Sequence, residues 1–362
     1  LLHRFYAMAD GRPGPSEADV LSSLSGLVQS GFTLLSVSLG SKLGLFRLLL
    51  DAKNPLTSHQ LADAAGYKER YVREWLGCMV TARLVTMDSD SATFWLSDAH
   101  KAALQSADNE LLLMSELLPL LAGVDDKLRS CFQKGGPAGI VDEDLSAQYE
   151  WERKFTASID VTPDITPLID YSDQTRTSLE RGSRVLDVGC GPGKHTITLA
   201  RMFPNSTFGG IDLSNEGISE ARREAESQKV ANATFEVRDI YNLPQDWSNS
   251  FDYVTFFYCL HDLGKPTQAL AETWRILKTG GILYIKDGPG HTKPSDNLGS
   301  AWSSTYYTFS LFFCLPRGLG EGPEGPGAMW GVEEESKVIK AAGFDIMKVE
   351  RDDHKNTYIC RK

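Results

Sequence analysis

Residues 185–193, Val-Leu-Asp-Val-Gly-Cys-Gly-Pro-Gly, constrain the fold more than any other part of this chain. An apolar strand leads directly into glycines at every second position, Gly189, Gly191 and Gly193. Because glycine has no Cβ atom, this spacing leaves open backbone at the carboxyl end of a parallel strand, where a charged ligand can approach. A dinucleotide-binding loop requires a small residue where this chain has Lys194. The run therefore predicts a cofactor loop of another kind.

Alternating strand and helix patterns surround and follow this run. Five segments after Gly182 have the composition of buried strands, and helical patterns separate them. The strands are expected at 184–188, 207–212, 234–238, 253–258 and 281–286, with a closing antiparallel pair at 344–350 and 356–360. This alternation is typical of a parallel sheet covered on both faces. Residues 181–362 are therefore predicted to form an α/β Rossmann-like domain with a seven-stranded, mostly parallel sheet.

Helical patterns dominate the first half of the chain. Apolar residues recur at helical spacing from Val20 to Leu50, which predicts mostly buried helices. Two shorter helices, at 59–65 and 69–84, precede two β-like runs at 84–87 and 94–97, the pattern of a winged helix-turn-helix. We expect four parts along the chain: a flexible arm at 1–19, a winged-helix dimerisation domain at 20–105, a helical linker and lid at 106–180, and the α/β domain at 181–362.

Charge bears on whether the winged helix reads DNA. The whole chain has 37 basic and 48 acidic residues and a net charge of −11, which opposes attraction to nucleic acid or to an anionic membrane. Residues 1–100 carry slightly more acidic than basic side chains. A DNA-reading module normally presents a basic face. A packing or dimerisation role is therefore favoured over DNA binding, and we expect no nucleic-acid partner.

The cysteines and the apolar runs indicate the compartment. The 6 cysteines lie far apart without a Cys-x-x-Cys pair, so the sequence predicts neither a zinc knuckle nor a disulfide framework. No run of consecutive apolar residues approaches the length that spans a bilayer. These features favour a cytoplasmic protein without a membrane partner. Because the chain begins with Leu1, the sequence leaves open whether a leader peptide has been removed.

The glycine spacing Asp-x-Gly-x-Gly-x-Gly at 187–193 resembles the first motif of class I methyltransferases, which bind S-adenosylmethionine and release S-adenosylhomocysteine. In such sheets the ligand lies beyond the carboxyl ends of the strands. Asp212 is then expected at the ribose hydroxyls, Asp239 at the adenine amino group with Ile240 as an apolar wall, and Asp187 near the ammonium group. The expected cofactor-binding residues are Asp187, Gly189, Cys190, Gly191, Gly193, Asp212, Leu213, Asp239, Ile240 and Tyr258.

These aspartates also have a simpler interpretation. Asp212 and Asp239 each precede a turn or helix, and aspartate is a common cap at such positions. Each residue alone leaves the two interpretations about equal. Three carboxylates at one sheet edge beside a glycine loop favour a ligand that carries a sulfonium and an ammonium.

His261 follows the expected fourth strand and is a candidate base. Methyl transfer is an in-line displacement, so the protein has mainly to align and deprotonate the acceptor. A histidine that titrates near neutral pH suits this task. An isolated histidine in such a loop more commonly makes only local contacts, so His261 needs support from its neighbours.

The segment Tyr258-Cys-Leu-His-Asp-Leu, followed by a helix at 268–277, Lys-Thr-Gly-Gly and a further strand, resembles the His-Asp-Trp region of winged-helix O-methyltransferases. The residues Arg70-Tyr-Val-Arg-Glu-Trp-Leu-Gly and Gly327-Ala-Met-Trp-Gly are similar to a bacterial and invertebrate branch of that family. The resemblance implies that His261 is the general base, that Asp287 orients it, and that the protein is a homodimer. Leu263 replaces the tryptophan of the plant motif, so a phenolic acceptor does not follow from the resemblance.

A long insertion at 289–331 is rich in aromatic residues. We expect part of it to wall an apolar acceptor pocket together with the helix near 146–159. The expected pocket residues are Trp151, Phe155, Trp302, Tyr306 and Trp330. Packing in the core or at a dimer interface is an equally good interpretation of these aromatics.

The sequence shows no metal site, because His261 and Asp262 alone do not supply the oxygen ligands of a hard cation. Together these features predict O-methylation of a small, partly apolar molecule. Two alternatives stay open: N- or S-methylation of a small molecule, and a non-catalytic winged-helix regulator that senses S-adenosylmethionine.

Overall fold

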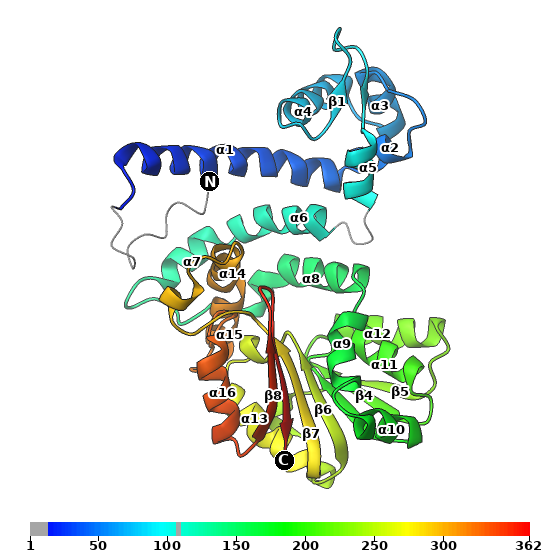
Figure 1. Ribbon diagram of the computed structural model, residues 1–362, viewed down its shortest axis with the longest axis vertical. Coiled ribbons are helices and arrows are strands. Elements are labelled where there is room, and N and C mark those ends of the chain that lie inside the picture. The colour runs from blue at the N-terminus through cyan, green and yellow to red at the C-terminus, as the bar shows by residue number, and fades with distance from the viewer. Residues whose placement is uncertain (1–13, 106–109) are drawn as a thin grey trace. The chain divides into compact units, whose positions relative to one another are not determined.

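The computed structural model describes residues 14–105 and 110–362 (Figure 1). It divides into two compact units, one up to Gly123 and one comprising Val124–Lys362, which are described separately. The division falls inside the segment 106–180 for which a linker and lid are expected.

The first unit contains a winged helix-turn-helix. Its elements are α1 (Glu17–Lys42), α2 (Leu45–Asp51), α3 (Ser58–Ala65), α4 (Glu69–Thr81), β1 (Thr86–Met87), β2 (Phe94–Trp95), α5 (Asp98–Gln105) and α6 (Glu110–Ala122). Thr57 and Gln60 form a capping box at the start of α3, and Gly66 ends this helix in the left-handed conformation. The wing strands β1 and β2 pair antiparallel. They are shorter than the predicted runs, because only two residues of each strand form backbone pairs with the other strand.

Helices α2, α3 and α4 bury the core of this unit. Trp75 of α4 packs edge-on against Phe46 of α2, with ring centroids 5.1 Å apart, and donates a hydrogen bond to the Ser36 carbonyl of α1 at 2.9 Å. A Cβ atom on Gly40 would lie only 2.4 Å from the Trp75 ring. Glycine at this position therefore lets α1 approach α4 closely.

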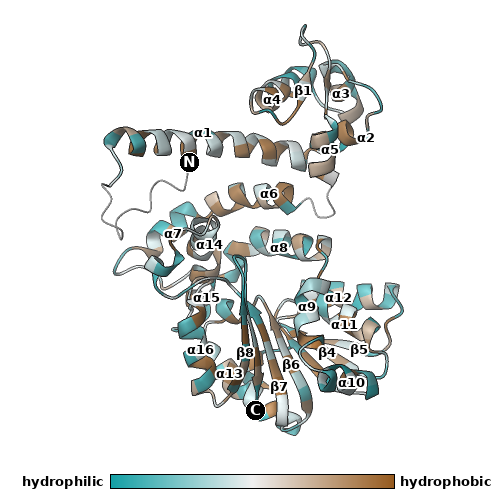
Figure 2. Ribbon diagram, in the orientation of Figure 1, coloured by the Kyte–Doolittle hydropathy of each residue, from teal (hydrophilic) through white to brown (hydrophobic). Residues whose placement is uncertain are grey.

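The prediction that the helices from Val20 to Leu50 are mostly buried is wrong for most of α1. Leu27 is 69% exposed and Phe32 71% exposed, whereas Leu45 and Leu49 of α2 are 1% exposed. The apolar spacing correctly predicts an apolar face, but the described part of this chain does not cover it. Figure 2 shows this helix with recurring brown positions along its length.

Helix α1 adds to the expectation drawn from unbroken apolar runs. Among the described residues, Glu17–Lys42 is long and apolar enough to cross a bilayer by length and composition alone, and its most apolar 18-residue window has a mean hydropathy of 1.4. The expectation relied on unbroken apolar runs, and the serines of α1 interrupt such runs without removing the apolar character. An interface helix and a spanning helix share these properties.

The second unit is built on a seven-stranded sheet in the order β5-β4-β3-β6-β7-β9-β8. The strands are β3 (Arg184–Val188), β4 (Thr207–Asp212), β5 (Ala233–Val237), β6 (Phe251–Phe257), β7 (Leu277–Asp287), β8 (Asp345–Arg351) and β9 (Asn356–Arg361). The first five are parallel, and β9 pairs antiparallel with β7 and β8. The predicted fold class is confirmed. The chain runs outward from β3 in one direction and then returns to β6, so the switch point lies at the carboxyl end of β3.

Helices cover both faces of this sheet (Figure 1). The helices of this unit are α7 (Asp125–Cys131), α8 (Ser146–Ser158), α9 (Thr162–Ile169), α10 (Asp173–Arg181), α11 (Lys194–Met202), α12 (Asn215–Ser227), α13 (Pro266–Ile276), α14 (Ser303–Phe309), α15 (Leu315–Glu321) and α16 (Gly331–Ala341). Side chains alternate along β6: Val254 and Phe256 pack with α13 and α16, and Tyr253 and Phe257 pack with α9 and α11. The sheet therefore has two buried faces, and only its strand ends are free to hold a site.

Candidate active site

The glycine loop after β3 has the open backbone that its spacing predicts. Gly189, Gly191 and Gly193 all have positive φ, at 67°, 50° and 77°. A Cβ atom on Gly193 would lie 2.7 Å from the Phe235 ring, whereas one on Gly191 would meet nothing within 4 Å. Gly193 is therefore required for packing at the start of α11. Gly191 leaves the space beside it open to a ligand.

Asp212 lies beside this loop at the end of β4. One of its carboxylate oxygens accepts a hydrogen bond from the Gly191 N–H at 2.8 Å, and the other accepts from the Ser214 N–H at 2.8 Å. A carboxylate has about four acceptor positions, so both oxygens keep capacity for a ligand. The neighbouring Leu213 is 53% exposed and available for apolar contact.

Asp239 follows β5 and caps a short 3₁₀ turn, where its side chain accepts from the Tyr241 N–H at 2.8 Å. Ile240 beside it is 5% exposed. The capping role considered from the sequence is thus present at Asp239. It leaves the second carboxylate oxygen for another partner.

Asp187 lies deeper than the other two aspartates and is 2% exposed. It accepts hydrogen bonds from the hydroxyls of Thr196 on α11 at 2.6 Å and Thr255 on β6 at 2.9 Å. Burial raises the pKa of Asp187 above its usual 3.8. In this position Asp187 ties the start of α11 to the central strand beneath the loop.

Cys190 and Tyr258 complete the expected cofactor residues. Cys190 is buried, and burial raises the pKa of its thiol well above 9.0, so it remains a neutral packing group. Tyr258 has a positive φ of 55° at the end of β6. Its hydroxyl donates to Asp164 of α9 at 2.9 Å. Tyr258 therefore connects this sheet edge to the helix that precedes the glycine loop.

His261 and Asp287 meet because β6 and β7 are adjacent parallel strands. The His261 backbone N–H donates to one Asp287 oxygen at 3.0 Å, and its ring Nδ1 bonds to the other. Asp287 is fully buried and His261 is 6% exposed. This bond fixes the tautomer with hydrogen on Nδ1, so the Nε2 atom is the one left for chemistry.

A second carboxylate lies at that other nitrogen. His261 Nε2 is 3.2 Å from an Asp262 oxygen. Burial opposes the charged imidazolium, but the carboxylates of Asp262 and Asp287 outweigh it and hold the pKa of His261 well above 6.5. The two carboxylates therefore favour the protonated form of His261.

The sequence analysis missed Arg317, a partly buried cation on α15. Its guanidinium donates to Asp262 at 2.8 Å and lies over the Tyr149 ring at 4.6 Å from the centroid. Glu152 of α8 is 3.8 Å away, and burial raises the pKa of Glu152 to about 7. A single arginine within an aromatic insertion was the available sequence signal.

Cys314 also lies close to the base. Among the described residues, the side-chain ligand atoms of His261, Asp262 and Cys314 lie within 4.8 Å of one another. Burial raises the pKa of the Cys314 thiol to about 11. This set of one nitrogen, one oxygen and one sulfur differs from the oxygen-rich set that Mg²⁺ requires.

The expected pocket residues fall into three separate places. Trp151 and Phe155 stack on each other along α8, with centroids 5.1 Å apart. Trp302 and Tyr306 both contact His354, at ring distances of 5.3 and 6.2 Å. The structure packs Trp330 into the core cluster under α16, with 8% of it exposed. Core packing, the alternative weighed from the sequence, therefore applies to Trp330.

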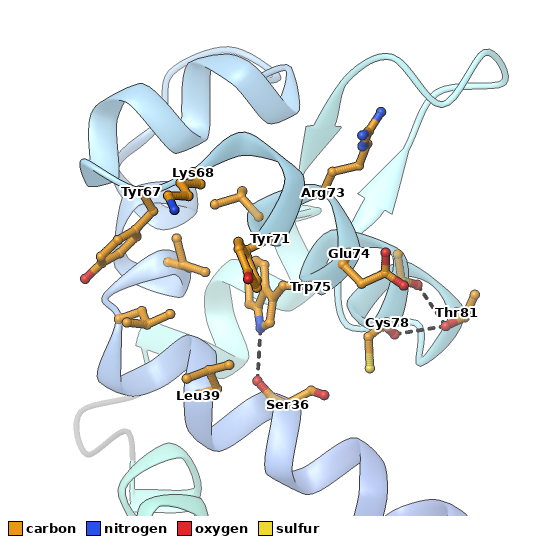
Figure 3. Close-up of a pocket in the computed structure, with 14 residues that line it drawn as sticks. Ser36, Leu39, Tyr67, Lys68, Tyr71, Arg73, Glu74, Trp75, Cys78 and Thr81 are labelled. Atoms are coloured by element: carbon orange, nitrogen blue, oxygen red, sulfur yellow. Dashed lines mark hydrogen bonds between the residues drawn. The ribbon is translucent and has the colours of Figure 1, made fainter.

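A groove of about 760 Å³ lies in the first unit, between α1 and α4 (Figure 3). Tyr67 and Tyr71 lie along it, and Trp75 forms its floor against Ser36. It contains none of the expected cofactor or catalytic residues. We therefore assign the chemistry to the edge of the sheet and not to this groove.

Comparisons with known proteins agree with this architecture. Residues 179–305 match the model of a methyltransferase domain, and residues 31–106 match an Rv2258c-like winged HTH domain. Demethylmenaquinone methyltransferase of Deinococcus radiodurans is 32% identical over 44% of this chain and 67% of its own length. The chain spans about half or less of the length of several other curated relatives that it matches.

Solved structures share the fold over nearly the whole chain. The mitomycin 7-O-methyltransferase MmcR superposes with a TM-score of 0.73 at 15% identity, covering 95% of this chain and 98% of that one. Human N-acetylserotonin methyltransferase, solved in complex with SAM, superposes with a TM-score of 0.68 at 16% identity, covering 97% and 99%. At these identities the likeness shows the fold alone.

Proposed function

We infer that this chain, which belongs to the class I S-adenosylmethionine-dependent methyltransferases with an amino-terminal winged-helix domain, methylates an oxygen of a small, partly apolar molecule. In this proposal His261 is the general base. The observation that carries this proposal is the clamp of Asp287 on the Nδ1 atom of His261. Such a clamp orients a base for an oxygen nucleophile. A hydroxyl is less acidic than a thiol and needs more help to lose its proton, whereas a neutral amine attacks through its lone pair.

The residues at the sheet edge fit S-adenosylmethionine. The donor supplies an electrophilic methyl group on a sulfonium. Gly191 leaves room for it next to the Asp212 carboxylate, which already bonds to the Gly191 N–H. We propose that Asp212 holds the ribose hydroxyls, that Asp239, Ile240 and Leu213 hold the adenine, and that Asp187 orders the loop near the ammonium. Acidic side chains here suit a cation and oppose a phosphorylated ligand.

The base then acts through one atom. Nε2 of His261 takes the proton of the acceptor hydroxyl while Asp287 keeps the ring oriented and stabilises the imidazolium. We propose that Trp151 and Phe155 contact the acceptor. Both lie on α8, the helix whose Glu152 neighbours Arg317. We propose that Trp302 and Tyr306 form a further wall of the acceptor pocket. Apolar walls exclude water from the reacting atoms.

The first test removes the base. In His261→Ala we expect turnover to fall by roughly 10²–10⁴-fold, the usual contribution of a general base, with donor affinity unchanged by calorimetry. Release of S-adenosylhomocysteine, measured over a panel of phenols, carboxylates, amines and thiols, identifies the acceptor class. His59→Ala, an exposed histidine of α3, is the matched control. Full activity of His261→Ala would show that this residue is not the base. Activity of the wild-type protein on amines or thiols alone would contradict the proposal of O-methylation.

A role in reading DNA is not favoured by the helix that would carry it. On α4, Arg70 pairs with Glu74 and Arg73 pairs with Glu69 one turn apart. These ion pairs neutralise the basic residues on the surface that would face phosphates. We propose that this unit assembles the protein as a homodimer and that the enzyme acts in the cytoplasm.

A further inference from the structure

Glu335 lies on α16 behind the carboxylate that holds His261. Glu335, Asp287 and Tyr358 are all fully buried. Strands β7 and β9 pair with Ile285 opposite Tyr358, so Asp287, two residues after Ile285, lies on the same face of the sheet as Tyr358. This is the face that α16 covers. The three side chains therefore meet beneath the catalytic loop.

Glu335 has an unusual environment for a carboxyl group. It interacts with the Asp287 carboxylate and the Tyr358 hydroxyl. Neither of its oxygens, however, forms a hydrogen bond of standard geometry with a described residue. An ionised carboxylate in this position would be buried beside the negative charge of Asp287. Burial first, and the charge of Asp287 second, hold the pKa of Glu335 well above 4.5. Both effects favour the neutral acid, and a neutral acid can donate a hydrogen bond.

We propose that Glu335 is a positioning residue for the base: its protonated carboxyl donates to Asp287 and so limits how strongly Asp287 holds the proton on His261. Donation to a carboxylate withdraws negative charge from it. The imidazolium of His261 is then stabilised less, and the ring gives up its proton at a lower pH. The groups that face Glu335 are Asp287 from β7, Tyr358 and Cys360 from β9, and His261 from the turn after β6.

Two substitutions separate this role from packing. Glu335→Gln keeps a donor and the size of the side chain, and Glu335→Leu keeps the size but removes the donor. The His261 pKa is measured in the full chain by NMR titration of labelled histidine, with the signal assigned by its loss in His261→Gln. We expect Glu335→Leu to raise this pKa by about one unit, a tenfold change in the unprotonated fraction below it. Glu335→Gln should leave it in place.

The control is Glu334→Gln, one residue away on the same helix, where Glu334 pairs with Lys337 at the surface. Glu334→Gln should leave the His261 pKa unchanged. A lowered His261 pKa in Glu335→Gln would mean that Glu335 is ionised, and this would overturn the proposal. An unchanged pKa in Glu335→Leu with only a lower melting temperature would overturn it too, because the role would then be structural.

The effect on rate rests on the proposed function, whereas the titration does not. If His261 is the base, the acidic limb of the kcat/KM profile of Glu335→Leu should move to higher pH together with the titration. A titration shift without a shift of the limb would uphold the coupling of Glu335 to His261 and count against His261 as the base.

Discussion

Asp262 contacts both His261 and a cation. It lies 3.2 Å from His261 Nε2 and accepts a hydrogen bond from the partly buried Arg317 at 2.8 Å. The contact with His261 raises the pKa of His261, and the charges of His261 first and Arg317 second lower the pKa of Asp262 to about 2 despite burial. Asp262 therefore stays charged near neutral pH and favours the protonated form of His261.

The pH profile follows from this arrangement. A general base acts in its unprotonated form, so a pKa well above 6.5 places the rise of kcat/KM above pH 6.5. Asp262→Asn removes one of the two raising charges, and we expect the acidic limb to move to lower pH by about one unit. Asp252→Asn, which removes a carboxylate paired with Lys278 at the surface, is the control. A limb that stays in place or moves upward in Asp262→Asn would contradict the assignment.

Sequence patterns predict the site residues unevenly. The positions of Gly191, Asp212 and His261 could be predicted because each follows a strand whose end is visible in the sequence. Arg317 and Glu335 could not, because their burial and partners arise from contacts with segments far along the chain. Their charge state depends on that burial, which no local pattern encodes.

At the scale of elements, the sheet was predictable and the environment of α1 was not. Strands such as β3 and β6 are short, mostly apolar runs separated by helical patterns, so their existence and order follow from local composition. Apolar spacing in α1 indicates an apolar face, but it does not identify the segment or partner that packs against this face. Figure 2 also shows a mostly brown α6 and a mostly teal α10, the contrast between a helix with little polar surface and one with a wide solvent face.

Helix α1 gives a prediction about assembly. Its exposed apolar residues are Val20, Leu21, Leu24, Leu27, Val28, Phe32, Leu34, Leu35 and Leu39. We expect a second copy to cover this face, because an apolar stripe of this length is costly in water. The double substitution Leu27→Glu with Phe32→Glu should convert a dimer to a monomer in light scattering. The single substitution Gln29→Glu, which adds a charge to the same helix without removing an apolar side chain, should not. A wild-type monomer, or wild-type chain that sediments with lipid vesicles, would contradict this assignment.

At the scale of the whole molecule, the charge distribution and the two units agree on small-molecule chemistry. The net charge of −11 and the paired arginines of α4 oppose nucleic-acid binding, and the second unit holds all the residues assigned to catalysis. The account depends on one property above others, namely that the open loop at Gly191, beside Asp212, accepts a sulfonium donor.

Calorimetric titration of the full chain with S-adenosylmethionine tests this property most directly. We predict saturable binding to the wild-type protein and at least about tenfold weaker binding to Gly191→Ala, whose new Cβ meets no protein atom within 4 Å and so fills only the ligand's space. Because Gly191 has a positive φ of 50°, alanine is strained there by about 1–2 kcal/mol, so the melting temperature of this variant should fall modestly while the protein stays folded. Absence of heat with S-adenosylmethionine, together with saturation by a nicotinamide or flavin nucleotide, would contradict the account.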